Sequence, residues 1–129
     1  MINRRHLFAS IAILAVASPA ARAAGAVAYT DAAFAEAQKA GKSILIDISA
    51  PWCPTCRAQA PIIESLLGTP ALKNMVTFKV DFDSQSEVVR AFGAQRQSTL
   101  IAFKGSAETG RSVGDTNPAS IEALLNSAI

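Results

Sequence analysis

The sequence predicts a single α/β domain in which helices flank a mixed β-sheet. Its 129 residues are enough for one domain. Short apolar or alternating runs, which are typical of strands, are separated by segments in which apolar residues recur at helical spacing. These segments follow the order helix, strand, helix, strand, helix, strand, strand, helix, without an internal repeat. Such an alternation is typical of α/β architecture.

The first 23 residues have the features of a cleavable export signal. Arg4 and Arg5 form a positive start, and residues 7–20 form an apolar run that is short for a membrane span. Residues 21–23, Ala-Arg-Ala, form a cleavage site. We therefore expect a domain over residues 24–129, with an uncleaved anchor as the alternative. The paired arginines leave both the general and the twin-arginine export routes open.

The charge and the export signal together indicate the compartment and exclude some partners. The whole chain carries +2, but the export signal holds three of its 12 basic residues, so the remaining nine against 10 acidic residues give −1. Nothing in this balance favours a nucleic acid or an anionic membrane surface as a partner. The style of the signal indicates the bacterial periplasm, which is oxidising. A dithiol that works there as a reductant needs a membrane thiol electron donor.

The first elements of the domain lead to a central strand. Residues 24–29 read as a short extended lead-in, and Thr30 or Asp31 can cap a helix that runs to about Ala40. Residues 43–49 follow as a strand. Because this strand is almost continuously apolar, we expect it to be covered on both faces.

Both cysteines of the chain, Cys53 and Cys56, lie between this strand and a helical pattern over residues 57–67. A strand–turn–helix connection places Cys53 at a helix N-terminus, where unpaired N–H groups and the helix dipole favour a thiolate. A thiolate attacks disulfides, and Cys56 is within reach to displace the captured group. The spacing therefore indicates dithiol–disulfide exchange.

Other uses of the cysteine pair are less consistent with the sequence. A structural disulfide across two residues closes a very small loop and adds little stability. Zinc takes four ligands, and the only histidine, His6, lies in the export signal. Haem attachment requires a histidine directly after the second cysteine, where Arg57 stands. A static bridge and a metal site shared between molecules remain the alternatives.

Asp47 interrupts the apolar strand with a carboxyl group. Burying a carboxylate is costly unless it is paired, solvated or protonated. Burial would raise the pKa of Asp47 and make it a proton carrier near neutral pH. The alternative is a carboxylate at a solvated end of the strand.

The second half of the chain supplies the remaining elements. Residues 76–82 alternate as a strand, residues 84–92 form a short helix, and residues 99–103 are a β run whose hairpin partner is 109–114. A last helix opens at Pro118. The residues expected to face inward from the two helices are Val88, Val89, Ile121, Leu124 and Leu125.

Residues 44–67, ILIDISAPWCPTCRAQAPIIESLL, resemble the active-site half of a thioredoxin. Residues 53–57 are also similar to periplasmic thioredoxin-like proteins of cytochrome c maturation. The resemblance implies the thioredoxin fold, and it implies that Asp47 moves a proton to or from Cys56. It places Lys79 near the acid, either paired with it or exposed. The residues that carry the match are Asp47, Ala50, Trp52, Arg57 and Pro61.

The sequence departs from thioredoxins at Ser98, which replaces a cis-proline between Gln97 and Thr99. A non-proline cis bond costs about 2.5–4 kcal/mol, so we expect a trans bond at Ser98. A trans serine restores a backbone N–H and adds a hydroxyl that could donate to the Cys53 thiolate. Changed client pairing, a metal held between two molecules, and a neutral replacement are the other hypotheses.

These observations favour an exported thiol–disulfide reductase in which Cys53 attacks, Cys56 resolves and Asp47 accepts the proton. The expected redox group is the Cys53–Cys56 disulfide itself, with no other cofactor and no metal. The expected partners are client proteins with disulfides and a membrane thiol electron donor, and the protein is expected to be a monomer. The residues expected to face the client are Trp52, Pro54, Thr55, Ser98 and Thr99.

The direction of the reaction is the most open part of this reading. Pro54 and Thr55, between the two cysteines, carry no charge that would stabilise the reduced form. We therefore expect a reducing pair, closer to thioredoxin than to strong oxidants. A disulfide oxidase or isomerase, and a non-catalytic thiol- or metal-binding module, are the alternative functions.

Overall fold

The computed structural model describes residues 25–129, so the expected export signal over residues 1–23 lies outside the described part of the chain. Five strands form one sheet in the order β1-β3-β2-β4-β5. β1 and β2 run parallel to β3, whereas β4 runs antiparallel to β2 and to β5. The strands are β1 Val27–Ala28, β2 Ser43–Ser49, β3 Val76–Asp81, β4 Thr99–Lys104 and β5 Ala107–Val113. The expectation of a mixed sheet is confirmed.

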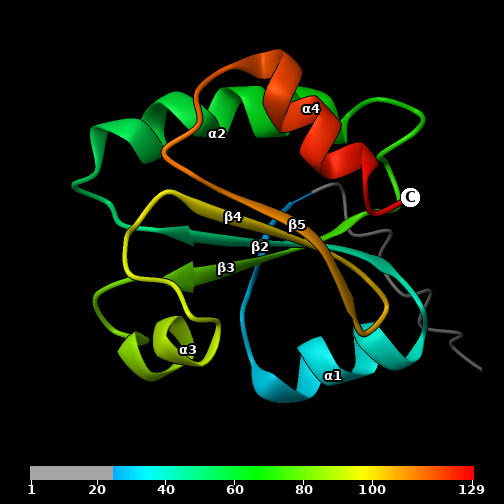
Figure 1. Cartoon of the computed structure of the whole chain (residues 1–129), viewed down its shortest axis with the longest axis horizontal. Helices are drawn as coiled ribbons and strands as arrows, with labels where there is room; N and C mark the ends of the chain where they lie inside the picture. The colour runs from blue at the N-terminus through cyan, green and yellow to red at the C-terminus, as the bar shows by residue number, and fades with distance from the viewer. Residues whose placement is uncertain (1–24) are drawn as a thin grey trace, which may run out of the picture.

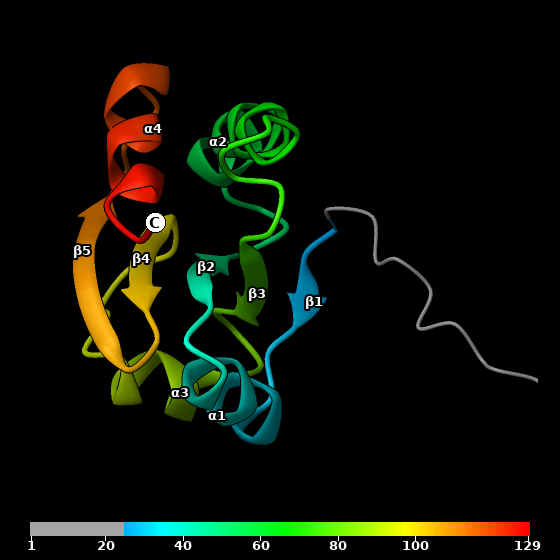
Figure 2. The same cartoon turned by 90° about the vertical axis from the view of Figure 1, so that its right-hand side faces the viewer.

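Four helices cover the two faces of this sheet. They are α1 Asp31–Lys39, α2 Pro54–Leu67, α3 Ser86–Ala91 and α4 Pro118–Asn126. Helices α2 and α4 lie on one face and α1 and α3 on the other, as Figures 1 and 2 show from two sides. No helix within residues 25–129 is long and apolar enough to span a membrane.

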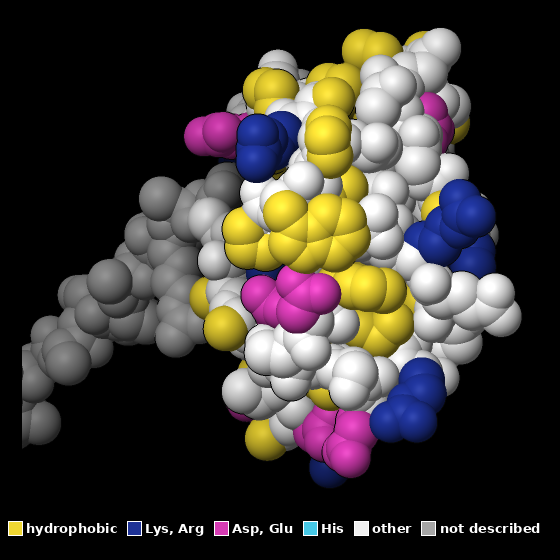
Figure 3. Space-filling model, turned by 90° about the vertical axis from the view of Figure 1, so that its left-hand side faces the viewer, with side chains coloured by type: hydrophobic (Ala, Val, Ile, Leu, Met, Phe, Trp, Pro, Cys, Tyr) yellow, Lys and Arg dark blue, Asp and Glu magenta, His cyan; other side chains and the backbone are white. Residues whose placement is uncertain are grey.

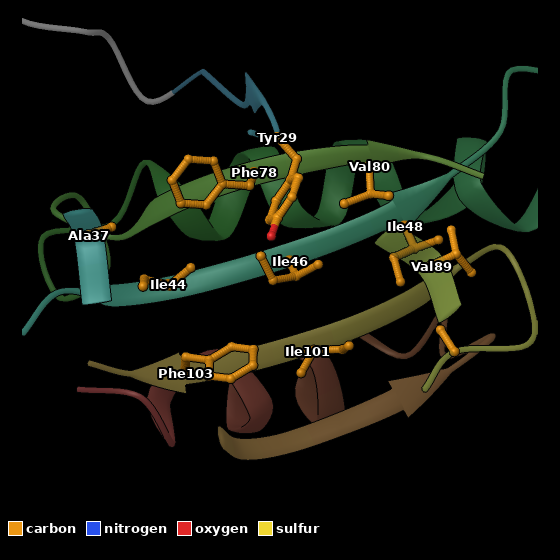
Figure 4. Packing of buried hydrophobic residues seen from close by; sticks show 11 residues of the cluster. Tyr29, Ala37, Ile44, Ile46, Ile48, Phe78, Val80, Val89, Ile101 and Phe103 are labelled. Carbon is orange, nitrogen blue, oxygen red and sulfur yellow. The ribbon is translucent and has the colours of Figure 1, made fainter. Parts of the chain in front are cut away.

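Strand β2 divides the core between these two faces because its side chains alternate. Ile44, Ile46 and Ile48 join the core beneath α1 and α3, shown in Figure 4, whereas Leu45 joins the core beneath α2 and α4. All four side chains are fully buried, which stabilises the fold by about 1.5–3 kcal/mol each. The same alternation turns Asp47 toward α2.

Two differences from the sequence prediction stand out, while the other boundaries lie within two residues of it. The lead-in before the first helix contains β1, whose Val27 lies opposite Phe78 of β3. Helix α2 begins at Pro54 rather than at Arg57. Proline suits a first helical position because it has no N–H to leave unpaired, so the helix starts inside the cysteine motif.

Antiparallel pairing brings the segments that carry the candidate site to one end of the molecule. Ile48 at the end of β2 lies opposite Thr99 at the start of β4. The turn that follows β2 and the loop that precedes β4 therefore meet beside the start of α2. Figure 3 views this end, where hydrophobic side chains gather in the middle and charged side chains surround them.

Candidate active site

Cys53 is the N-cap of α2, as expected. Its φ of −84° and ψ of 113° are extended, and Pro54 follows at the start of the helix. The Cys53 Sγ accepts a hydrogen bond from the Cys56 backbone N–H at 3.1 Å. An N–H donor and the positive end of a helix dipole both stabilise negative charge on this sulfur.

Cys56 lies in a different electrostatic environment. Burial raises the pKa of Cys56 to about 11, and the neighbouring Cys53 acts in the same direction. The backbone N–H groups of Ala50 and Ser98 act in the opposite direction on that pKa, but more weakly. Cys56 is therefore a protonated thiol at neutral pH. Both cysteines are free in this structure, which represents the dithiol form.

Exposure does not distinguish the two sulfurs. Cys53 is 1% exposed and Cys56 is 9% exposed, and both pack against Ala50 and Phe82. The difference between the cysteines lies in their hydrogen bonds: the Cys53 sulfur accepts the Cys56 N–H at the start of α2, whereas the neighbouring Cys53 side chain helps to raise the pKa of Cys56.

Asp47 is buried on the α2 side of the sheet, where only 7% of it is exposed. Burial raises the pKa of Asp47, and the charge of Lys79 acts in the opposite direction. Asp47 and the buried Thr77, whose Oγ1 has no hydrogen-bond partner, line a cavity of about 230 Å³. A cavity of this size with several polar groups in its lining can hold water. The other lining residues are Gly25, Ala26, Ala60, Ile63, Glu64, Leu67 and Lys79.

Lys79 forms no ion pair with Asp47 within the described residues, so the expectation of an exposed charge fits its position better. It lies directly opposite Asp47 in the pairing of β2 with β3, and its side chain is exposed. The charge of Lys79, which also lines the cavity, therefore lowers the pKa of the Asp47 carboxyl group, against the effect of burial.

Ser98 has the expected trans peptide bond, since residues 25–129 contain no cis bond. Its φ of 58° lies in the left-handed region, at a cost of about 1–2 kcal/mol for a residue with a Cβ. The side chain is buried, and its hydroxyl donates to the Gln97 carbonyl at 2.6 Å. The hydroxyl therefore has a different acceptor from the hypothesised Cys53 thiolate, and it is the backbone N–H of Ser98 that acts on a cysteine.

Trp52 lies on the surface beside Cys53 and is 51% exposed, which excludes the alternative that it is a core residue. Its indole Nε1 donates to Asp83 Oδ2 at 2.7 Å. Asp83 itself lies in a turn closed by Asp81, whose carboxylate accepts from the Asp83 N–H at 2.9 Å. No local pattern points to Asp83, because the contact joins positions 31 residues apart.

The remaining residues expected at the site differ in their exposure to solvent. Pro54 is exposed and Thr55 is half-buried. Thr99 is buried, and its hydroxyl donates to the Arg96 carbonyl at 2.7 Å. Arg57 donates to the Pro51 carbonyl from Nε at 3.3 Å and from Nη2 at 3.1 Å, so it braces the turn before Cys53.

Within residues 25–129, no three or more histidine, cysteine, aspartate and glutamate side chains are grouped as metal ligands. One buried polar residue near the cysteines, Gln59, was missed by the sequence analysis. It lies three positions after Cys56 and four before Ile63, and this spacing puts it on the inward face of α2. A polar residue on the inward, otherwise apolar face of a helix is the sequence signal that could have identified Gln59.

Comparison with known proteins identifies the family. The Thioredoxin family model matches residues 25–127. The chain belongs to the thioredoxin family. A thioredoxin from Alicyclobacillus acidocaldarius is 35% identical over 96 residues, which cover 74% of this chain and 90% of that protein. A thioredoxin from Mycobacterium tuberculosis is 31% identical over 104 residues, which cover 80% of this chain and 89% of that protein.

A solved structure supports the same fold. The structure of Trxlp from Edwardsiella tarda matches with a TM-score of 0.74 and 39% identity, covering 76% of this chain and 95% of that one. The thioredoxin fold expected from residues 44–67 is confirmed, and the Cys53–Cys56 spacing fits the family motif. The protein is therefore a thiol–disulfide oxidoreductase of the thioredoxin type, a family that acts on protein disulfides.

Proposed function

We propose that this protein is an exported reductase of client protein disulfides, acting through Cys53 and Cys56 without a further cofactor. The observation that carries the proposal is the asymmetry of the pair. The Cys53 sulfur accepts an N–H at the start of α2, while burial raises the pKa of Cys56 to about 11. One sulfur is suited to attack and the other to wait as a thiol.

The cycle follows from this asymmetry. The Cys53 thiolate attacks one sulfur of a client disulfide, and the other client sulfur leaves as a thiolate. Cys56 then gives up its proton and attacks Cys53 in the mixed disulfide. The second client sulfur leaves, and the products are a client dithiol and a Cys53–Cys56 disulfide. A membrane thiol electron donor returns two electrons and restores the dithiol.

Asp47 is the proposed acceptor of the Cys56 proton. Its burial raises its pKa toward the range in which a carboxylate can both take and release a proton near neutral pH. The cavity beside it supports a route through water to solvent. In this scheme Asp47 takes the proton as Cys56 attacks, and the leaving client thiolate is protonated from solvent.

The exposed Trp52 and Pro54 support a client-docking surface beside Cys53. Thr55, Ser98 and Thr99 complete the proposed surface, with Ser98 and Thr99 contributing their backbone because their side chains are buried. We propose that the protein acts there as a monomer.

The proposed location is the periplasm, and its support is the sequence of residues 1–23. Cell fractionation of the full chain tests it. We expect a shortened form, beginning near Ala24, in the periplasmic fraction. An unshortened chain that remains with the cytoplasmic fraction would contradict export.

Trapping tests the roles of the two sulfurs. In Cys56→Ser, a client captured by Cys53 cannot be released, so mixed disulfides should accumulate. Cys53→Ser is the matched control, and it should trap little. Equal trapping by both variants would show that the attacking and resolving roles are assigned wrongly. The redox state of the captured clients in cells that lack the protein would show whether it reduces or oxidises them.

A further inference from the structure

Gln59 is a buried polar residue that the redox cycle does not use. It lies on the inward face of α2, is 1% exposed, and follows Cys56 by one helical turn. Its Nε2 donates to the Ser98 carbonyl at 3.3 Å and to the Asp115 carbonyl at 2.8 Å. Its Oε1 is buried without a partner. Because an unpaired buried carbonyl is unfavourable, the glutamine calls for an explanation other than stability.

The first of these bonds fixes the backbone at Ser98. The Ser98 carbonyl accepts a second hydrogen bond, from the Gly114 N–H at 3.0 Å. Two donors from different elements, α2 and the end of β5, therefore hold one peptide group. The next residue, Thr99, lies opposite Ile48 at the end of β2, so this peptide group lies beside the turn that leads to the cysteines.

Ser98 needs such a constraint because its conformation is not the one that a serine prefers. Its φ is 58°, and negative φ values are lower in energy for a residue with a Cβ. Without the two donors, rotation to negative φ would carry the Ser98 carbonyl away from its present partners.

The second bond connects the same glutamine to the start of α4. The Asp115 carboxylate accepts from the Asn117 N–H at 2.8 Å and from the Ser120 hydroxyl, so the Asp115 backbone is fixed at the start of that helix. Gln59 thus joins the helix that carries the cysteines, the loop before β4 and the segment before α4.

We propose that Gln59 is a positioning residue that holds the left-handed Ser98 peptide against the cysteine pair, so that the loop before β4 presents a fixed backbone to a client protein. This inference rests on the proposed reductase function and deepens it. Gln59 itself does not touch the reacting sulfurs in this role, and it acts through Ser98.

The test compares a protein disulfide with a small one. Insulin must dock on the loop, whereas the small aromatic disulfide DTNB needs only the Cys53 sulfur. We expect Gln59→Leu, which has a similar volume and no donor, to slow insulin reduction about tenfold, as expected for the loss of one to two hydrogen bonds. The rate with DTNB should stay within about twofold of the wild-type rate, since Cys53 and its cap are unchanged.

Hydrogen exchange gives a second readout at the loop itself. The Gly114 amide donates to the Ser98 carbonyl, so in Gln59→Leu it should exchange about tenfold faster if the peptide is released. Gln59→Met is a second donor-free variant in case the leucine variant does not fold. Ile121→Val, in the same core beneath α2 and α4, is the control for a general loss of packing. It should change neither the insulin-to-DTNB ratio nor the Gly114 exchange.

Ser98→Pro tests whether Gln59 acts through Ser98. Proline fixes φ near −65°, so the present position of the carbonyl is lost. In that background, Gln59→Leu should have no further effect on insulin reduction.

The outcomes separate the two hypotheses. A wild-type protein that reduces neither insulin nor DTNB would contradict the proposed function. A wild-type protein that reduces both, with a Gln59→Leu variant that keeps the wild-type insulin rate and Gly114 exchange, would overturn the role of Gln59 alone. A full effect of Gln59→Leu in the Ser98→Pro background would also overturn it.

Discussion

At the scale of single residues, Asp47 shows how a site can be kept at the expense of stability. Its carboxyl group sits in an apolar strand, 7% exposed, and burial raises its pKa. The folded state therefore holds this proton at pH values where the unfolded chain has already released it. Stability falls as the pH rises from the ordinary value of 3.8 toward the raised value.

The substitution Asp47→Asn removes the loss of stability that a buried carboxyl group causes as the pH rises. We expect the variant to be more stable than the wild type at neutral pH, by about 1–3 kcal/mol, because an amide carries no charge to desolvate. The difference should shrink as the pH falls and vanish below 3.8, where both states of the wild type are protonated. Urea unfolding across this pH range measures it.

The matched control for Asp47→Asn is Asp83→Asn, because Asp83 is exposed and an asparagine oxygen can still accept from Trp52. It should change stability by less than about 0.5 kcal/mol at every pH. A gain in Asp47→Asn that did not depend on pH would contradict the burial of a titrating carboxyl group.

At position 98, glycine and alanine should reverse their usual order of stability. Glycine normally destabilises ordered structure relative to alanine by about 0.5–1 kcal/mol. At a φ of 58° the left-handed penalty falls on alanine alone, so Ser98→Gly should be more stable than Ser98→Ala by about 1 kcal/mol. Denaturant unfolding of the two variants measures the order. The normal order, with alanine more stable, would contradict the left-handed conformation.

Sequence reasoning at this scale succeeded where chemistry and spacing are local. Cys53 as a helix cap and Asp47 as a buried acid follow from a few neighbouring residues. Gln59 bonds to Ser98, 39 positions away, and Asp83 bonds to Trp52, 31 positions away. The roles of Gln59 and Asp83 are therefore visible only in the folded chain. The trans bond at Ser98 was predictable, but its left-handed φ depends on donors from two other elements.

At the scale of elements, segments with a clear period were predicted well and the two-residue strand β1 was not. Strand β2 was expected over residues 43–49 and is found there, because its five central residues, apolar with one interruption, are a clear pattern. Strand β1 has two residues and no period, and only its pairing with β3 defines it. The start of α2 was placed three residues late because the helical pattern of apolar residues begins after the cysteine motif.

The packing of α4 on β5 leads to a prediction at this scale. A Cβ on Gly110 would lie 2.9 Å from Leu124 Cδ1 of α4, which is shorter than a van der Waals contact. Leu124 Cδ1 is the end of a half-buried side chain that can turn aside, so Gly110→Ala should destabilise the fold by about 0.5–1.5 kcal/mol, the cost of a less favourable rotamer. Denaturant unfolding measures this loss.

Gly68→Ala is the matched control for Gly110→Ala. Gly68 has a φ of −77° at the end of α2, and its nearest neighbour to a new Cβ is 3.4 Å away. Alanine is compatible with that backbone, so the control should be neutral or more stable by about 0.4–1 kcal/mol. Equal losses in both variants would contradict the close approach of α4 to β5.

At the scale of the whole molecule, the two cores serve different purposes. The core beneath α1 and α3 is apolar and rich in aromatic contacts, such as the edge-to-face pair of Tyr29 and Phe92 with centroids 5.6 Å apart. The face toward α2 carries the polar Asp47, Gln59 and Thr77 among its buried residues. Both sides of the sheet thus supply buried apolar contacts, and the side toward α2 also holds buried polar groups near the cysteines.

The mixed α/β class was predictable from the order of segments, but the thioredoxin fold was not predictable from periodicity alone. The decisive signal was the motif around Cys53 and Cys56 with Asp47 before it and Pro61 after it. No local pattern predicts the register of β2 and β4, which sets Thr99 opposite Ile48. This register brings the loop that contains Ser98 to the cysteines.

A redox titration tests the central claim most directly. The purified protein is equilibrated in glutathione buffers of graded potential, and its free thiols are then alkylated. Mass spectrometry shows how many thiols were free at each potential. We expect Cys53 and Cys56 to lose their thiols together in one two-electron step with a midpoint near that of thioredoxin, about −270 mV. Independent oxidation of the two thiols, or a pair that does not reopen, would contradict the exchange mechanism. A midpoint near that of strong oxidants, about −120 mV, would contradict the reductase.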